Sequence, residues 1–195
     1  MIKFVSRDSF VNMIRYGVLG VLGCCLLSLP LAATEWGLSA ASGYGVAQMV
    51  PMRFGIAKTW DRLWYPEAAW QLKGYWEGSL YLLRRHHPQL APDHRSVTAL
   101  AGAAVLRLAR TTAWHGAWPY VELGFGLSYL DRTRWARRDL GTHFQFEDRI
   151  GLGLRWGTES QYDLGYKAIH FSNGHLGPVN HGMNMQVISL AYWFH

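Results

Sequence analysis

Residues 119–129 read PYVELGFGLSY, a stretch in which apolar side chains occupy every second position. The apolar positions are Val121, Leu123, Phe125, Leu127 and Tyr129. Because successive side chains of a β-strand point to opposite faces, one face of this strand suits lipid and the other suits a narrow polar interior. The stretch therefore predicts a strand of a transmembrane β-barrel.

The same alternation repeats along the chain after residue 33. We expect strands at 39–44, 52–60, 70–83, 97–108, 119–129, 142–156, 161–172 and 184–194. Lys, Glu and Arg fall on the interior face of several of them, where opposite charges can pair. An open sheet edge in lipid would leave backbone groups unpaired, at a cost of several kcal/mol each. We therefore predict an all-β fold, an eight-stranded antiparallel transmembrane β-barrel; a soluble β-sandwich is the alternative.

The first 33 residues have the organisation of a secretory signal. Three basic residues come first, an apolar run covers 16–31, and the small residues Ala32 and Ala33 follow. We predict a signal peptide at 1–33 and a barrel domain at 34–195, with an uncleaved membrane anchor as the alternative. Both cysteines fall within the signal, so we expect no disulfide in the barrel.

The formal charge of the chain is +6, and the predicted signal carries a small part of it. A positive excess suits an anionic partner, and an exported protein meets phosphorylated glycolipid more readily than nucleic acid. If the N-terminus starts in the periplasm, two basic connections face outside. Their arginines are Arg84, Arg85, Arg132, Arg134, Arg137 and Arg138. Arginine binds phosphate through paired hydrogen bonds, so these residues are candidates to hold lipid A; ordinary solvated loops are the alternative.

The segment with the clearest chemistry is 166–174, which reads YKAIHFSNG. His170 and Ser172 are two positions apart, so on a strand they share the apolar, lipid-facing side. An imidazole beside a serine hydroxyl is the minimum for nucleophilic acyl transfer, because the base takes the hydroxyl proton and later gives it to the leaving group. Folding needs no polar group on that face. We therefore predict a nucleophile and a base at the outer rim, in contact with a membrane ester.

Several motifs resemble the PagL family of lipid A 3-O-deacylases over nearly the whole chain after the signal. They are AIHFSN at 168–173, FEDRIG at 146–151 followed by Gly153-Leu154, GYW at 74–76, and Asn180-x-Gly182. The resemblance implies a bacterial outer-membrane barrel that hydrolyses the 3-position ester of lipid A or lipopolysaccharide. It implies Ser172 as nucleophile, His170 as base, and no cofactor.

The chain departs from the family where a glutamate usually orients the histidine, because Asn184 stands there. Pairing of the last two strands can place residue 184 opposite residue 172. An amide carbonyl still accepts the imidazole N–H but stabilises an imidazolium less than a carboxylate does. Asp148 is the one charge on an outward apolar stripe, and a register that pairs 148 with 170 would set it beside His170. Alternatively, a bulge turns Asp148 inward to pair with Arg149 or Arg155.

Backbone N–H groups of Asn173 and Gly174, directly after the nucleophile, are the expected oxyanion donors. His175 and His181 are interpreted as solvated loop residues, and no metal site is expected. Besides hydrolysis, two functions stay open: an outer-membrane acyltransferase, which would yield a more acylated lipid, and a barrel that serves structure or adhesion without catalysis. A homodimer is one possible assembly.

Overall fold

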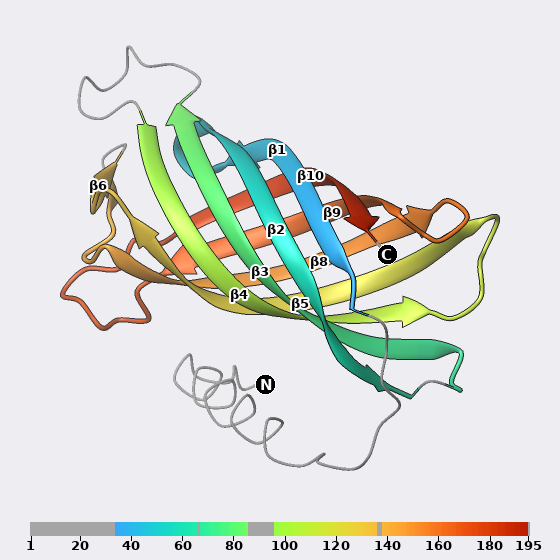
Figure 1. Cartoon of the computed structure of the whole chain (residues 1–195). Helices are drawn as coiled ribbons and strands as arrows, with labels where there is room; N and C mark the ends of the chain where they lie inside the picture. Colours follow the sequence, from blue (N-terminus) through green and yellow to red (C-terminus); the bar gives the residue numbers. More distant parts are fainter. Residues whose placement is uncertain (1–33, 66, 86–95, 136–137, 195) are drawn as a thin grey trace, which may run out of the picture.

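A computed structural model describes residues 34–65, 67–85, 96–135 and 138–194; the predicted signal peptide lies outside them. Eight long strands form one closed antiparallel barrel, in which β1 pairs with β10 (Figure 1). The strands are β1 (Trp36–Gly45), β2 (Met49–Trp64), β3 (Trp70–Arg85), β4 (Ser96–Arg110), β5 (Ala117–Leu130), β8 (Phe144–Trp156), β9 (Tyr162–Ser172) and β10 (Met183–Phe194). The prediction of an eight-stranded antiparallel barrel is confirmed. Among the described residues, no helix is long and apolar enough to cross a membrane.

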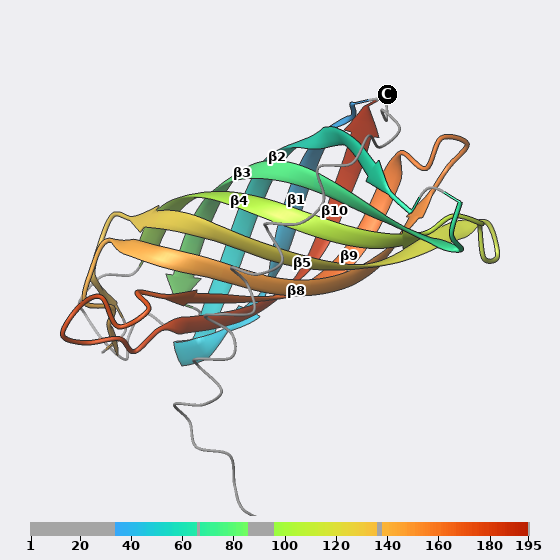
Figure 2. The same cartoon turned by 90° about the horizontal axis from the view of Figure 1, so that it is seen from below.

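Two smaller elements lie at one end of the barrel. A 3-10 turn, η1 (Val46–Gln48), joins β1 to β2. A pair of short strands, β6 (Arg134–Trp135) and β7 (Arg138–Asp139), lies in the connection between β5 and β8. Figures 1 and 2 show β6 and the 173–182 connection at this end, which we call the outer end, and the C-terminus at the other. The sequence did not predict the β6–β7 hairpin.

The outer wall of the barrel is apolar. In β5, every second side chain faces outward, with Leu123 60% exposed and Phe125 51% exposed. Aromatic side chains gather near the end opposite the hairpin, where Trp156 stacks on Tyr162 with 5.8 Å between ring centroids. An apolar band with aromatic residues at its border is the surface that a lipid bilayer requires.

The lumen of the barrel is filled by paired charges. Arg107 binds Glu122 at 2.9 Å and Asp163 at 2.8 Å. Lys167 approaches Glu122 to 2.8 Å, and Tyr120 donates a hydrogen bond to Asp163 at 2.6 Å. Buried charges are tolerated when each one has a partner of opposite sign. The prediction that interior charges pair is therefore confirmed.

Toward the outer end, the charged lumen gives way to an apolar plug, the buried cluster that contains Tyr81, Trp135, Leu140, Ile169 and Phe171. Trp135 comes from β6 and is 2% exposed, so the hairpin inserts a large side chain into the barrel mouth. Phe171 meets Tyr81 edge to face with 5.1 Å between ring centroids. Since Ile169 and Phe171 point inward, strand alternation directs His170 and Ser172 outward.

Arg107→Met tests whether the luminal ion pairs are needed for stability. Removing this cation breaks the ion pair of Asp163 and leaves Lys167 as the direct ion-pair partner of Glu122 among the described residues. We expect the free energy of unfolding, measured by urea titration in lipid vesicles, to fall by roughly 3–5 kcal/mol. The matched control is Arg62→Met, since Arg62 is exposed near the end of β2 that lies away from the outer end of the barrel. Equal unfolding midpoints for the two variants would show that the luminal pairs contribute nothing.

Candidate active site

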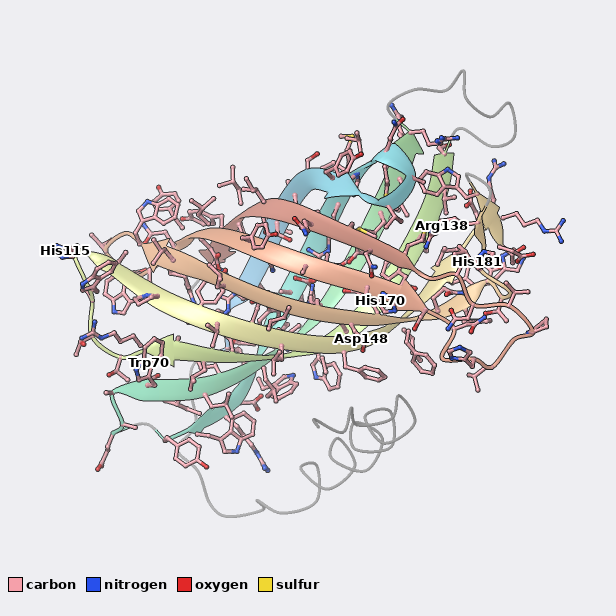
Figure 3. All side chains as sticks on the ribbon, turned by 180° about the vertical axis from the view of Figure 1, so that it is seen from behind. Trp70, His115, Arg138, Asp148, His170 and His181 are labelled. Atoms are coloured by element: carbon pink, nitrogen blue, oxygen red, sulfur yellow. The ribbon has the colours of Figure 1, made fainter. Side chains whose placement is uncertain are left out.

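The strand register places His170 between two polar residues from neighbouring strands. Asp148 of β8 is its partner on one side, and Asn184 of β10 is its partner on the other. All three belong to the outward-facing set of their strands. Figure 3 shows Asp148 and His170 near each other on the wall, toward the outer end of the barrel.

The expectation that Asn184 lies opposite Ser172 is wrong by two residues. Pairing of β9 with β10 begins at Phe171 and Met183, which sets Asn184 opposite His170. The cause lies in Asn173, whose side-chain amide donates to the carbonyls of Leu140 at 2.9 Å and Val179 at 2.7 Å. These bonds fix the path of the 173–182 connection, and the path of a connection sets the register of the two strands that it joins.

The imidazole of His170 has close neighbours at Nδ1 and at Cε1. Its Nδ1 lies 2.5 Å from Oδ1 of Asn184. Since a carbonyl oxygen only accepts, Nδ1 is the donor, and in the neutral imidazole the lone pair is then on Nε2. Gly182 lies near Cε1 and Nε2, where an added Cβ would come within 3.1 Å and 3.7 Å of these atoms. The Nδ1 contact therefore selects the neutral tautomer that a general base needs.

Ser172 ends β9 on the same face as His170, and its side chain is partly exposed. Within the described ranges, no hydrogen bond engages its hydroxyl, so the group is free to react. Its cross-strand partner is Phe146, which stacks on Phe125 with 5.8 Å between ring centroids. Ser172 thus stands beside an aromatic surface suited to an acyl chain. Sequence reasoning did not single out Phe146, although its place on the outward stripe of β8 was a signal for it.

Asp148 faces outward, so the alternative of an inward bulge is wrong. The register of β8 with β9 runs without a shift, and the neighbouring arginines have other partners. Arg149 binds Glu77 at 2.6 Å and Arg155 binds Glu35 at 3.0 Å. The carboxylate of Asp148 instead interacts electrostatically with His170.

The two expected oxyanion donors differ in the structure. The backbone N–H of Asn173 donates to the side-chain oxygen of Asn180 at 3.1 Å, so it is not free in this arrangement. Gly174 has φ of +61° and is exposed, and no acceptor in the described part of the chain engages its N–H. A Cβ at Gly174 would meet the Phe146 ring at 2.8 Å, so this position requires glycine. Sequence reasoning gave Asn180 no role in positioning this turn.

The basic residues at the outer end fall into two groups. Arg84 is exposed at the end of β3 with the half-buried Arg85, and Arg132 lies 3.5 Å from Asp131. Arg134 has an 80% exposed side chain and pairs with Asp139 at 3.1 Å. Arg137 lies outside the described residues.

Arg138 differs from these arginines because its guanidinium is bound to two backbone carbonyls. Its Nε donates to the carbonyl of Gly182 at 3.0 Å, and its Nη2 donates to the carbonyl of His181 at 2.8 Å. His181 is exposed in the loop, as expected, and its Nδ1 also accepts the backbone N–H of Asp139 at 3.0 Å. No cluster of three metal-ligating side chains occurs among the described residues.

Comparison with known proteins adds to this geometry. Residues 49–193 match the family described as lipid A 3-O-deacylase (PagL). The chain is 30% identical to lipid A deacylase PagL of Pseudomonas aeruginosa over 153 residues, which cover 75% of this chain and 79% of that protein. It is 33% identical to lipid A deacylase PagL of Bordetella bronchiseptica over 81 residues, or 42% of this chain and 44% of that protein.

The fold is shared with a solved structure as well. The crystal structure of the outer membrane enzyme PagL superimposes with a TM-score of 0.70 at 26% identity, over 80% of this chain and 98% of that one. Barrel closure, the apolar outer wall and the sequence match agree with one another. The chain is an outer-membrane β-barrel and belongs to the PagL family of lipid A 3-O-deacylases.

Proposed function

We propose that this chain hydrolyses the ester at the 3-position of lipid A and releases a 3-hydroxy fatty acid, with Ser172 as nucleophile and His170 as base. The observation that carries the proposal is the 2.5 Å contact of His170 Nδ1 with Asn184 on the lipid-facing wall. In the neutral imidazole this contact leaves the lone pair on Nε2, and Ser172, whose hydroxyl is free, is two positions away. Family membership supports the choice of ester.

The reaction proceeds through an acyl-enzyme. Oγ of Ser172 attacks the ester carbonyl while Nε2 of His170 takes the hydroxyl proton. The tetrahedral intermediate then collapses, and His170 gives the proton to the departing sugar oxygen. In the second half, water attacks the acyl-enzyme, His170 takes a proton from the water, and Ser172 recovers that proton as the fatty acid leaves. Ser172 and His170 form their hydrogen bond when substrate binds, because catalytic hydrogen bonds are often long before the substrate complex forms.

Two neighbours of His170 share the work that a single glutamate does in a Ser-His-Glu arrangement. Asn184 fixes the tautomer, because its carbonyl accepts the Nδ1 proton. Asp148 supplies the negative charge that stabilises the imidazolium formed during attack. A carboxylate on a lipid-facing wall is costly unless it is partnered, and the histidine provides that partner. We propose the Gly174 N–H as the donor to the oxyanion.

The substrate lies along the wall with its head group at the outer end. The phosphates of lipid A meet the arginine rim, where Arg84 and Arg134 are exposed and Arg85, Arg132 and Arg137 stand nearby in sequence. The acyl chains extend below this level, against Phe146 and Phe125. Such an arrangement brings the ester, which lies between sugar and acyl chain, to Ser172. A homodimer stays a prediction.

Ser172→Ala and His170→Asn test the nucleophile and the base. We expect each variant to lose the release of 3-hydroxy fatty acid almost completely, by roughly 10³-fold or more, because the pair acts as a unit. The measurement is mass spectrometry of lipid A incubated with purified barrels in vesicles. Full release by either variant would contradict the mechanism, and appearance of a more acylated lipid in place of free acid would favour transfer over hydrolysis.

Asp148→Asn and Asn184→Glu test the division of work around His170. Removing the Asp148 charge should lower kcat about tenfold, since about 1.4 kcal/mol of imidazolium stabilisation corresponds to that factor. Asn184→Glu should raise kcat, because a carboxylate then binds Nδ1 directly. The matched control is Asp61→Asn, which changes an exposed acid near the end of β2 that lies away from the outer end of the barrel. An Asp148→Asn variant with unchanged kcat would show that Asn184 alone supports the histidine.

A further inference from the structure

Arg138 connects the outer hairpin to the chain segment that leads into the active site. Its guanidinium donates two hydrogen bonds from one side chain, to the carbonyls of His181 and Gly182. These two residues directly precede β10, the strand that carries Asn184. Figure 3 shows Arg138 and His181 side by side at the outer end, with His170 on the wall below them.

Gly182 is the residue through which Arg138 reaches the histidine. It adopts φ of +56° and lies against the imidazole, so that a Cβ there would approach Cε1 of His170 to 3.1 Å. Asn184 holds the same ring through Nδ1. Any movement of Gly182 away from the barrel would open space beside Nε2, the atom that must face Ser172.

The β6–β7 hairpin, which carries Arg138, is held in place by buried side chains. The hairpin is anchored in the barrel mouth by Trp135 and Leu140, which are 2% and 0% exposed. Asp139 exchanges backbone and side-chain bonds with His181: its N–H donates to Nδ1 at 3.0 Å, and its carbonyl accepts the His181 N–H at 3.3 Å. Arg138 therefore links Gly182 to a hairpin that is held in place by the buried side chains of Trp135 and Leu140.

Phosphate binding is a weaker account of Arg138. Bidentate recognition of a phosphate uses two parallel N–H groups of one guanidinium. In Arg138, Nε and Nη2 are already engaged by backbone carbonyls, in contrast to the largely exposed Arg134 of the same hairpin.

We infer that Arg138 is a positioning residue of the active site, which holds Gly182 against the imidazole and so keeps Nε2 of His170 directed at Ser172. The inference rests on the proposed function, because it assigns Arg138 a part in that reaction. It predicts an effect on turnover and not on substrate affinity, since Arg138 acts on the base and not on the lipid.

The test is the separation of kcat from KM for lipid A deacylation by purified barrels in vesicles. Arg138→Ala should lower kcat by roughly 10- to 100-fold, as expected when a catalytic group is displaced by about 1 Å, with KM unchanged. Arg138→Lys should not rescue kcat, because a single ammonium cannot reproduce the two fixed N–H donors. Arg134→Ala removes an equal charge from the same hairpin and should raise KM. Arg62→Ala, at the other end of the barrel, is the control for loss of charge alone.

A second readout separates positioning from general stability. If Arg138 acts through the imidazole, Arg138→Ala should reduce kcat much less in an Asn184→Ala background, where the ring is already loose, than in the parent chain. Fully multiplicative losses would overturn the inference. So would a wild-type kcat with a raised KM in Arg138→Ala, which would make Arg138 a phosphate ligand.

The outcomes also separate this inference from the proposed function. Inactivity of the wild-type barrel would refute the proposed function, whereas an active wild type with an equally active Arg138→Ala would refute only the positioning role. If Arg138→Ala fails to fold, as judged by gel mobility without heating, Arg138→Lys carries the test. A wild-type kcat in that variant would overturn the inference.

Discussion

The burial of Phe171 inside the barrel decides the orientation of the residues on either side of it. Phe171 is fully buried in the apolar plug, and side chains of a strand alternate between its faces. His170 and Ser172 must therefore project from the outer wall, where no folding requirement calls for polar groups. The plug also holds Trp135 and Leu140, so the same packing that orients Ser172 anchors the hairpin that reaches the segment before β10. The geometry of the site therefore depends directly on the packing of this cluster.

The strand pattern could be predicted because a closed barrel in lipid leaves little freedom. Apolar and polar positions alternate so regularly in 119–129 that the face of each residue follows from parity alone, and the pairing of 148 with 170 followed from one tight turn. The register of Asn184 did not follow, because it is set by the path of the 173–182 connection. That path depends on bonds from Asn173 to Leu140, which is far away in sequence, and to Val179 inside the connection. The β6–β7 hairpin was missed for a related reason, since its basic residues resemble a solvated loop and only Trp135 indicates burial.

In the proposed mechanism His170 is supported by two residues, with an amide and not a carboxylate at Nδ1. His170 has neighbours on both sides in the sheet, and each neighbouring strand contributes a polar residue at its level. Asn184 satisfies the geometric need for a fixed tautomer, while Asp148 satisfies the electrostatic need for nearby negative charge. A closed barrel makes this possible, because each of its strands has a hydrogen-bonded neighbour on both sides. The arginines of the outer end could not be separated from sequence either. Arg134 is largely exposed, whereas Arg138 is bound to backbone carbonyls, and residue type alone does not distinguish the two cases.

Labelling with a serine-reactive fluorophosphonate, followed by mass spectrometry of the modified peptide, is the most direct test of a nucleophile on the lipid-facing wall. We predict a stable adduct on Oγ of Ser172 in the folded barrel, and a greatly reduced labelling rate when His170 is replaced by Asn. An adduct on a different serine, or a labelling rate that does not depend on His170, would contradict it.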